Sequence, residues 1–272
     1  MEIVDTHAHL YSEDELRYPM KKDPLRPPPG TGTVAHLRQM MTLAGVAKVV
    51  AVQTGTAYLY DNRFLADTVK ANRNWMAGVC TLDPSDPSSP MELTRLVTNY
   101  GIRGVRVPFS EAKQPEDLFR IWNAANSLGI VVCAHFRGDY YKTLGTMLKR
   151  FPEVPVVLDH CAYPFVSEPP ENSTLKKVLE LSHFPNLYAK LSFVVMASNM
   201  PYPCSDAHFL VKAVIEAFGP ERCMWGSCFP TELWLPKVTY EQHLRIFTEE
   251  IGLEENVKKG VLETTPTKLW FS

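Results

Sequence analysis

The first predicted strand reads Ile3-Val4-Asp5-Thr6-His7-Ala8-His9-Leu10 and carries two histidines one residue apart. Alternate residues of an extended strand project from the same face, so His7 and His9 are expected to point into one small volume. Two neutral imidazoles placed in this way can hold a single divalent cation. An H-x-H pattern also arises by chance, so its meaning depends on where the other histidines fall.

Seven further short runs rich in Val, Ile or Ala follow along the chain, each succeeded by a polar turn and an amphipathic stretch. They cover residues 48–52, 76–80, 102–107, 130–135, 154–160, 187–191 and 222–227. Their nearly continuous apolar character is typical of strands that are covered on both faces, as in parallel sheets. With the first strand they make eight.

The segments between these runs carry helix signals. In 115–128, apolar residues recur at helical spacing, Pro115 suits the first turn and Gly129 suits the C-terminal cap. Gly45 and Gly101 are expected to end two other helices. Eight strands alternating with helices predict a (β/α)8 TIM barrel, formed as a single domain over 1–272. An open doubly wound sheet is the alternative, but no glycine-rich phosphate loop follows the first strand.

Composition excludes some classes of function. The formal net charge of -2 gives no reason to expect a nucleic acid or an anionic membrane surface as partner. The six cysteines form no C-x-x-C pair and most lie in apolar runs, so we expect reduced core thiols and a cytoplasmic protein. No signal peptide and no membrane span is recognisable. The sequence does not reveal the oligomeric state, and a homo-oligomer stays open.

Polar residues gather where the predicted strands end. In a barrel of this kind the active site lies at the C-terminal ends of the strands. The residues at these ends are His7 and His9, Arg106, His135, Asp159 with His160, Lys190 with Ser192, and Ser227 with Cys228. Four of the eight histidines fall here, and this clustering favours a functional site more than any single motif does.

Each of these residues also has a structural interpretation. His135 could be a hydrogen-bonded core histidine, and His160 could be held in place by Asp159. Lys190 could pair with a buried carboxylate, and Arg106 could form a salt bridge, because inward charges in a barrel need partners. Taken together with the H-x-H strand, however, a site is the better explanation.

Four motifs in this order resemble the amidohydrolase-2 family, a TIM-barrel branch of the amidohydrolase superfamily that includes lactonases and, more distantly, decarboxylases. They are 5–9 (DTHAH), 150–160 (RFPEVPVVLDH), 186–192 (NLYAKLS) and 224–227 (MWGS). The resemblance implies that His7, His9, His135 and His160 are metal ligands. It also implies that Arg106 grips a carboxylate or carbonyl of the substrate. Some relatives work without metal.

The chain departs from the family at one position. The family pattern expects Trp-Gly-Ser-Asp, and Cys228 occupies the place of the aspartate that binds metal and moves the water's proton. Cys228 could be a zinc ligand, a nucleophile activated by histidine, or inert. Asp159 and Glu232 are substitute bases, although Asp159 is better suited to orienting His160.

These observations predict a metal-dependent hydrolase of a small carboxylate-bearing lactone or cyclic ester, with a divalent ion, zinc in the first place, that could be absent. The alternatives are a metal-assisted decarboxylase and a catalytically silent barrel that binds a small acid. We expect catalysis by His160, Cys228, Arg106 and Asp159, substrate binding by Arg106, Lys190 and Tyr163, and metal binding by His7, His9, His135, His160 and Cys228. Tyrosines in the loops at the mouth suggest a flat or aromatic-derived substrate.

Overall fold

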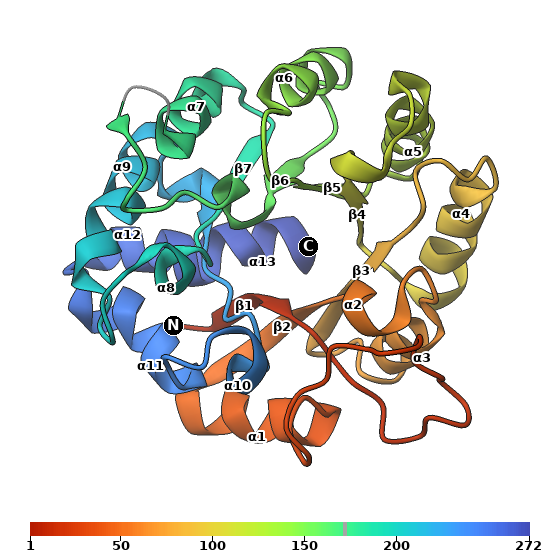
Figure 1. The fold of residues 1–272 in the computed structure, drawn as a ribbon, viewed down its shortest axis with the longest axis horizontal. Coiled ribbons are helices and arrows are strands. Elements are labelled where there is room, and N and C mark those ends of the chain that lie inside the picture. The colour runs from red at the N-terminus through yellow and green to blue at the C-terminus, as the bar shows by residue number, and fades with distance from the viewer. Residues whose placement is uncertain (171–172) are drawn as a thin grey trace.

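The computed structural model, which describes residues 1–170 and 173–272, contains eight parallel strands in sequential order. This confirms the predicted (β/α)8 TIM barrel, seen along its axis in Figure 1. The strands are β1 (Ile3–Ala8), β2 (Val46–Val52), β3 (Met76–Thr81), β4 (Gly104–Pro108), β5 (Val131–His135), β6 (Val156–Leu158), β7 (Leu187–Lys190) and β8 (Cys223–Met224).

The ring of strands closes between its first and last members. The backbone N–H of Thr6 donates to the Trp225 carbonyl at 3.1 Å, and that of His9 donates to the Phe229 carbonyl at 2.7 Å. A parallel bridge pairs Ala8 with Phe229. These contacts bring the N-terminal histidines beside the segment that follows β8, so residues more than 200 positions apart share one site.

Helices surround the barrel (Figure 1). They are α1 (Val34–Ala44), α2 (Gly55–Tyr58), α3 (Arg63–Ala71), α4 (Ser89–Tyr100), α5 (Pro115–Leu128), α6 (Tyr141–Arg150), α7 (Thr174–Glu180), α8 (Val194–Ala197), α9 (His208–Phe218), α10 (Thr231–Trp234), α11 (Tyr240–Arg245), α12 (Glu255–Lys259) and α13 (Thr265–Trp270). Short 3-10 turns include η1 (Phe109–Glu111), η2 (Asp159–Ala162), η4 (Leu181–His183), η5 (Ser205–Ala207) and η6 (Pro220–Arg222), and η7 (Ile246–Glu250) and η8 (Gly260–Thr264) are π-helical.

The predicted helix signals act where they were expected. α5 begins at Pro115 and ends before Gly129, whose φ of 62° is left-handed and whose N–H reaches carbonyls of the last turn. Gly45 and Gly101 end α1 and α4 in the same way. Thr33 starts α1 by accepting a hydrogen bond from the His36 N–H. These local rules fix the lengths of three helices.

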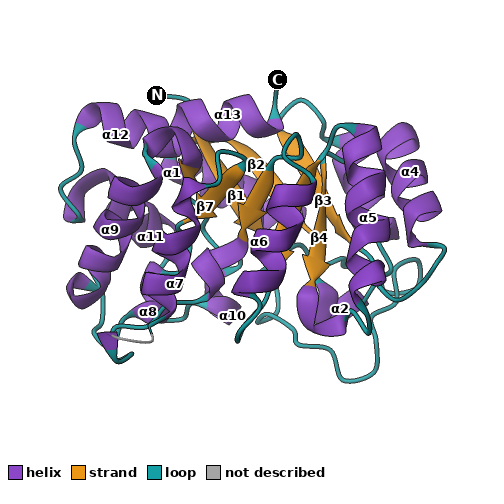
Figure 2. Ribbon diagram, turned by 90° about the horizontal axis from the view of Figure 1, so that it is seen from above, coloured by secondary structure: helices purple, strands orange, loops and turns teal. Residues whose placement is uncertain are grey.

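The core has two layers. Outward-facing strand residues pack against the helices, and inward-facing residues fill the barrel, among them Val50, Val79, Val131 and Val157. Trp270 on α13 joins the inner cluster. The helix α13 lies across the end of the barrel where the strands begin, as Figure 2 shows. That end is sealed, so the opposite end is the one available to a ligand.

All six cysteines are buried and free in the structure, in agreement with the expectation of reduced core thiols. Within residues 1–170 and 173–272, no helix has the length and apolar character required to cross a bilayer.

Candidate active site

Polar side chains occupy the last inward positions of the strands. Four of these side chains lie at or near strand ends: Thr81 on β3, Arg106 on β4, His135 on β5 and Lys190 on β7. Asp159 and His160 follow β6 directly. The alternation of the pleat turns these side chains toward the barrel axis. The structure therefore brings the predicted strand-end residues together at one mouth.

The two strand-1 histidines converge as the i, i+2 spacing predicts. Nε2 of His7 lies 3.1 Å from Nε2 of His9, and Nδ1 of His9 donates to the Val52 carbonyl at 3.0 Å. Nζ of Lys190 lies 3.2 Å from Nδ1 of His7. Because an ammonium group can only donate, Nδ1 of His7 accepts, and the His7 proton sits on Nε2 and points to His9. A directed chain of hydrogen bonds thus runs from Lys190 through His7 to His9.

Asp159 joins the two buried cations. Its Oδ1 accepts from Nζ of Lys190 at 2.7 Å, and its Oδ2 accepts from Nε of Arg106 at 2.7 Å. Burial by itself would raise the pKa of Asp159, but the charges of Lys190 and Arg106 outweigh it and hold this pKa well below its ordinary value. Both structural interpretations considered for Lys190 and Arg106 therefore describe real contacts, made with the same carboxylate.

His160 has a different partner from the one expected. Oγ of Ser192 lies 2.7 Å from Nδ1 of His160, and Sγ of Cys228 lies 3.8 Å from the same nitrogen. His160 has a positive φ of 54°, so the backbone turns sharply after Asp159 and the two adjacent side chains point to different neighbours. Ser192 rather than Asp159 is hydrogen-bonded to this imidazole.

Tyr163 lies between two of the histidines. Its hydroxyl is 2.9 Å from Nε2 of His135, and its ring stacks on His160 with centroids 4.8 Å apart. The Arg137 guanidinium covers the tyrosine ring, 3.7 Å from its centroid. Tyr163 thus fixes the orientation of the His135 ring through this hydrogen bond.

Burial governs the protonation of the site. Desolvation lowers the pKa of His9 and of His135 to about 3, and it lowers the pKa of His7 and of His160 well below the ordinary 6.5. Nearby cations act in the same direction on His7, His9 and His135. All four imidazoles are therefore neutral near pH 7, which is the state required of a metal ligand or proton acceptor.

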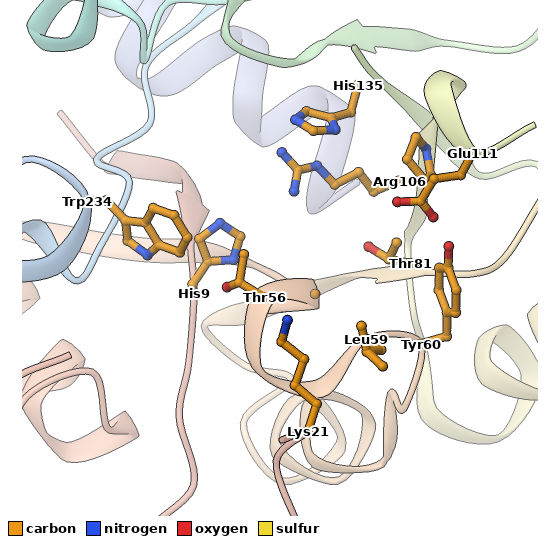
Figure 3. A pocket seen from close by; sticks show the side chains of 12 residues that line it. His9, Lys21, Thr56, Leu59, Tyr60, Thr81, Arg106, Glu111, His135 and Trp234 are labelled. Carbon is orange, nitrogen blue, oxygen red and sulfur yellow. The ribbon is translucent and has the colours of Figure 1, made fainter. Parts of the chain in front are cut away.

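A cavity of about 320 Å³ opens at this mouth (Figure 3). Its lining includes three of the predicted site residues, His9, Arg106 and His135. His7, His160, Lys190 and Cys228 are buried among the described residues behind this lining, with at most 4% of each exposed, and Tyr163 is also outside it. The predicted site thus divides into residues that face the cavity and residues that support them.

The sequence predicts that loops 11–33, 54–62 and 108–114 line the mouth, but it did not single out most of the side chains that they contribute to the cavity wall. The missed residues that line it include Lys21, Thr56, Thr81, Glu111 and Trp234. Thr81 could have been recognised, because it directly follows the predicted strand 76–80. Lys21 belongs to an irregular connection whose path depends on tertiary contacts, such as its N–H that donates to the Ala57 carbonyl at 2.8 Å. Trp234 ends α10, a helix of one turn for which the sequence shows no signal.

The side chains near His7 have the chemistry of a zinc site. Donor atoms of His7, His160 and Cys228 all lie within 4.8 Å of one another, and Nε2 of His9 adjoins that of His7. Imidazole and thiol groups suit zinc, so the residues fit such an ion in kind and proximity. Metal binding at Nε2 of His7 has one requirement: the proton now directed to His9 must leave.

Comparison with known proteins places the chain in a family. It is 24% identical over 237 residues to an L-fucono-1,5-lactonase of Burkholderia ambifaria, covering 84% of this chain and 80% of that protein. A probable 2-pyrone-4,6-dicarboxylic acid hydrolase of Acinetobacter baumannii, crystallised with citric acid, shares the fold with a TM-score of 0.82, 21% identity and 99% coverage of both chains. An amidohydrolase of Burkholderia multivorans, crystallised with bound zinc, has a TM-score of 0.76, 18% identity and 99% coverage of both. The family model for Amidohydro_2, amidohydrolase, matches residues 4–271, and the chain belongs to this family.

Proposed function

We propose that this chain hydrolyses a small lactone or cyclic ester that carries a carboxylate. The proposal rests on one observation above all: Arg106 lines the cavity with a charge that its single carboxylate partner does not fully balance. Asp159 is shared between Arg106 and Lys190, so this triad retains an excess positive charge. Only Nε of Arg106 is used by Asp159, and in the described part of the chain its two terminal nitrogens have no recorded hydrogen bond.

An arginine fork of this kind suits a carboxylate or a developing oxyanion. Guanidinium groups bind carboxylates through two parallel N–H donors, and in a partly desolvated cavity such contacts are strong. The side chain of Arg106 is 14% exposed, and its anchoring by Asp159 fixes its direction before a ligand arrives. A site arranged in advance loses little freedom when the substrate binds.

Hydrolysis also needs a group that accepts the proton of the attacking water. His135 lines the cavity and is neutral, and its Nε2 faces Tyr163, so its Nδ1 is the nitrogen that could take this proton. His9 is also neutral, but both of its ring nitrogens are engaged, with Val52 and with His7. Asp159 is held by Arg106 and Lys190 and, like Glu232, is not among the described residues that line the cavity. In this proposal Lys190 and Tyr163 are positioning residues, which hold His7 and His135 respectively.

A divalent ion, zinc in the first place, would be held by a set drawn from His7, His9, His135, His160 and Cys228. When bound, such an ion would polarise the lactone carbonyl and lower the pKa of its water. His135 could join the set through Nε2 only by giving up its contact with Tyr163. The zinc in the Burkholderia multivorans relative supports zinc as the first metal to test.

The decisive experiment measures ester hydrolysis by the purified protein, with its metal content determined in parallel. We compare a lactone bearing a carboxylate with the same ring lacking it. Arg106→Lys should lower kcat/KM for the first by about tenfold to a thousandfold, because the bidentate contact is lost, and change the second far less. His7→Ala should abolish turnover of both.

Arg103→Lys is the matched control, since Arg103 is exposed and lines a different pocket, at the sealed end of the barrel. Ligand-induced thermal stabilisation without turnover would identify a silent binding barrel instead. Release of carbon dioxide from an aromatic carboxylate, with no lactone hydrolysis, would identify a decarboxylase.

A further inference from the structure

One wall of the cavity contains polar groups that no other described residue satisfies. Thr81, the last residue of β3, is only 8% exposed, yet its Oγ1 has no hydrogen-bond partner within the described chain. Leaving a buried hydroxyl without a partner costs about 1 to 3 kcal/mol, and native proteins rarely tolerate it without reason. Because Thr81 lines the cavity, a bound ligand is the natural partner of this hydroxyl.

Glu111 lies on the same wall. It ends η1, the turn that directly follows β4, and it lines the cavity together with Thr81 and Tyr60. Figure 3 shows the Glu111 carboxylate and the Tyr60 and Thr81 side chains on one side of the cavity, away from His9 and Trp234. Within residues 1–170 and 173–272, Glu111 has no recorded salt bridge or side-chain hydrogen bond. Glu111 is exposed at the cavity wall, yet the desolvation that it has there raises its pKa, as expected for a carboxyl group that lacks a cationic partner here.

A hydroxyl and a carboxylate that line the same cavity are suited to one kind of ligand group. A carboxylate accepts strongly from a hydroxyl group, and a threonine hydroxyl can donate or accept. A second carboxylate on the ligand would meet the negative charge of Glu111 and be repelled. The wall therefore favours ligand hydroxyls and disfavours a second acidic group.

We propose that the Thr81–Glu111 wall binds a hydroxyl group of the substrate, so that the substrate is a hydroxylated lactone of the sugar-acid type rather than a flat dicarboxylated pyrone. This inference rests on the proposed lactone hydrolysis. It replaces the expectation of an aromatic-derived substrate, which was based on loop tyrosines: of Tyr58, Tyr60, Tyr140, Tyr163 and Tyr202, Tyr60 is the one that lines the cavity in the described structure.

The experiment compares two lactones that both carry a carboxylate. One is the monolactone of glucaric acid, which has free hydroxyls, and the other is the γ-lactone of α-hydroxyglutaric acid, which has none. Thr81→Val and Glu111→Gln should each lower kcat/KM for the hydroxylated lactone by about tenfold to a hundredfold, as loss of a hydrogen bond to a buried or charged group does. For the second lactone the change should stay within about threefold.

Glu116→Gln, one turn into α5, is the matched control, because Glu116 is exposed and is not among the residues that line the cavity. Equal losses on both lactones, or no loss on either, would overturn the inference while leaving the hydrolase intact. A wild-type preference for 2-pyrone-4,6-dicarboxylate over the hydroxylated lactone would overturn it as well. Glu111→Gln should instead shift the preference toward that pyrone by removing the opposing charge.

If no lactone is hydrolysed, the proposed function fails and the wall is tested by binding alone. Gluconate should then raise the Tm of the wild-type protein more than hexanoate does, and Thr81→Val should remove that difference. Equal stabilisation by both acids, or by neither, would refute the wall as a hydroxyl site.

Discussion

At the scale of single residues, the site depends on which group each buried polar atom contacts. Asp159 is fully buried and is tied to two cations, so it neutralises charge rather than moving protons. His160 is held by Ser192, which occupies the nitrogen that a neighbouring thiol would need in order to be activated. Burial also raises the pKa of the Cys228 thiol to about 12, so it stays protonated at neutral pH. Sγ of Cys228 lies 3.8 Å from Nδ1 of His160, but as a protonated thiol it is not an activated nucleophile in this arrangement.

Cys228→Asp should increase lactone hydrolysis, because it supplies a carboxylate base next to His160. A general base contributes about a hundredfold or more to such reactions, and a gain of at least tenfold in kcat is expected despite some loss of stability from the buried carboxyl group. Steady-state kinetics with the metal content of each variant measured will test this. Cys228→Ser is the control, which removes the thiol without adding a base. Loss of activity in both variants would mean that the thiol takes part.

At the scale of elements, the contact between β1 and the segment after β8 positions the histidines. Asp5 accepts from the backbone N–H of Ser227 at 2.8 Å, from its hydroxyl at 2.6 Å and from the Tyr240 hydroxyl at 3.0 Å. Gly226 passes so close to β1 that a Cβ placed on it would lie 2.8 Å from Cβ of His7 and 3.1 Å from its backbone nitrogen. This segment has no room for a side chain.

Gly226→Ala should therefore shift His7 and destabilise the protein by about 1 to 3 kcal/mol, as overpacking does in a closely packed core. The kcat of the folded variant should also fall, beyond what a smaller folded fraction explains, because the His7–His9 alignment changes. Gly145→Ala is the matched substitution within α6, where the new Cβ would meet Phe184 only at 3.8 Å. It should stabilise the helix by about 0.5 to 1 kcal/mol. Urea unfolding and kinetics on both variants measure the contrast, and equal behaviour of the two would contradict this account.

At the scale of the whole molecule, five histidines with lowered pKa values, four of them buried, make stability depend on pH. Burial lowers the pKa of His9, His135 and His243 to about 3, and it lowers the pKa of His7 and His160 well below 6.5. Below about pH 6.5 the unfolded chain takes up protons at these positions and the folded chain does not. The free energy of unfolding is therefore highest above this pH and falls as the pH decreases.

Each such histidine should contribute a slope of about 1.4 kcal/mol per pH unit to the free energy of unfolding below pH 6.5. Urea unfolding between about pH 7 and pH 5 measures the sum. His243→Gln removes one buried imidazole, which accepts from Nε1 of Trp225 outside the cavity, and should reduce the slope by one such step. A flat profile across this range would disprove the neutral, buried state of the histidines.

The sequence alone determined that eight strands alternate with helices, and where three of the helices end. The apolar runs, the cap glycines Gly45, Gly101 and Gly129, and the i, i+2 spacing of His7 and His9 act over a few residues, so they can be read without knowing the fold. The order of the strands and the position of their polar ends then placed most of the site at one mouth of the barrel.

Only the tertiary structure decided which hydrogen-bond partner each buried polar group of the site has. Asp159 is the partner of both buried cations, Ser192 is the partner of His160, and Lys190 is the partner of His7. The two residues of each of these contacts lie 31 to 183 positions apart in the sequence. The unpaired hydroxyl of Thr81 and the carboxylate of Glu111 likewise come to line one cavity only once the barrel has closed. Hydrogen bonds are directional and act over about 3 Å, so their pairing follows from the packed geometry and not from the order of residues along the chain.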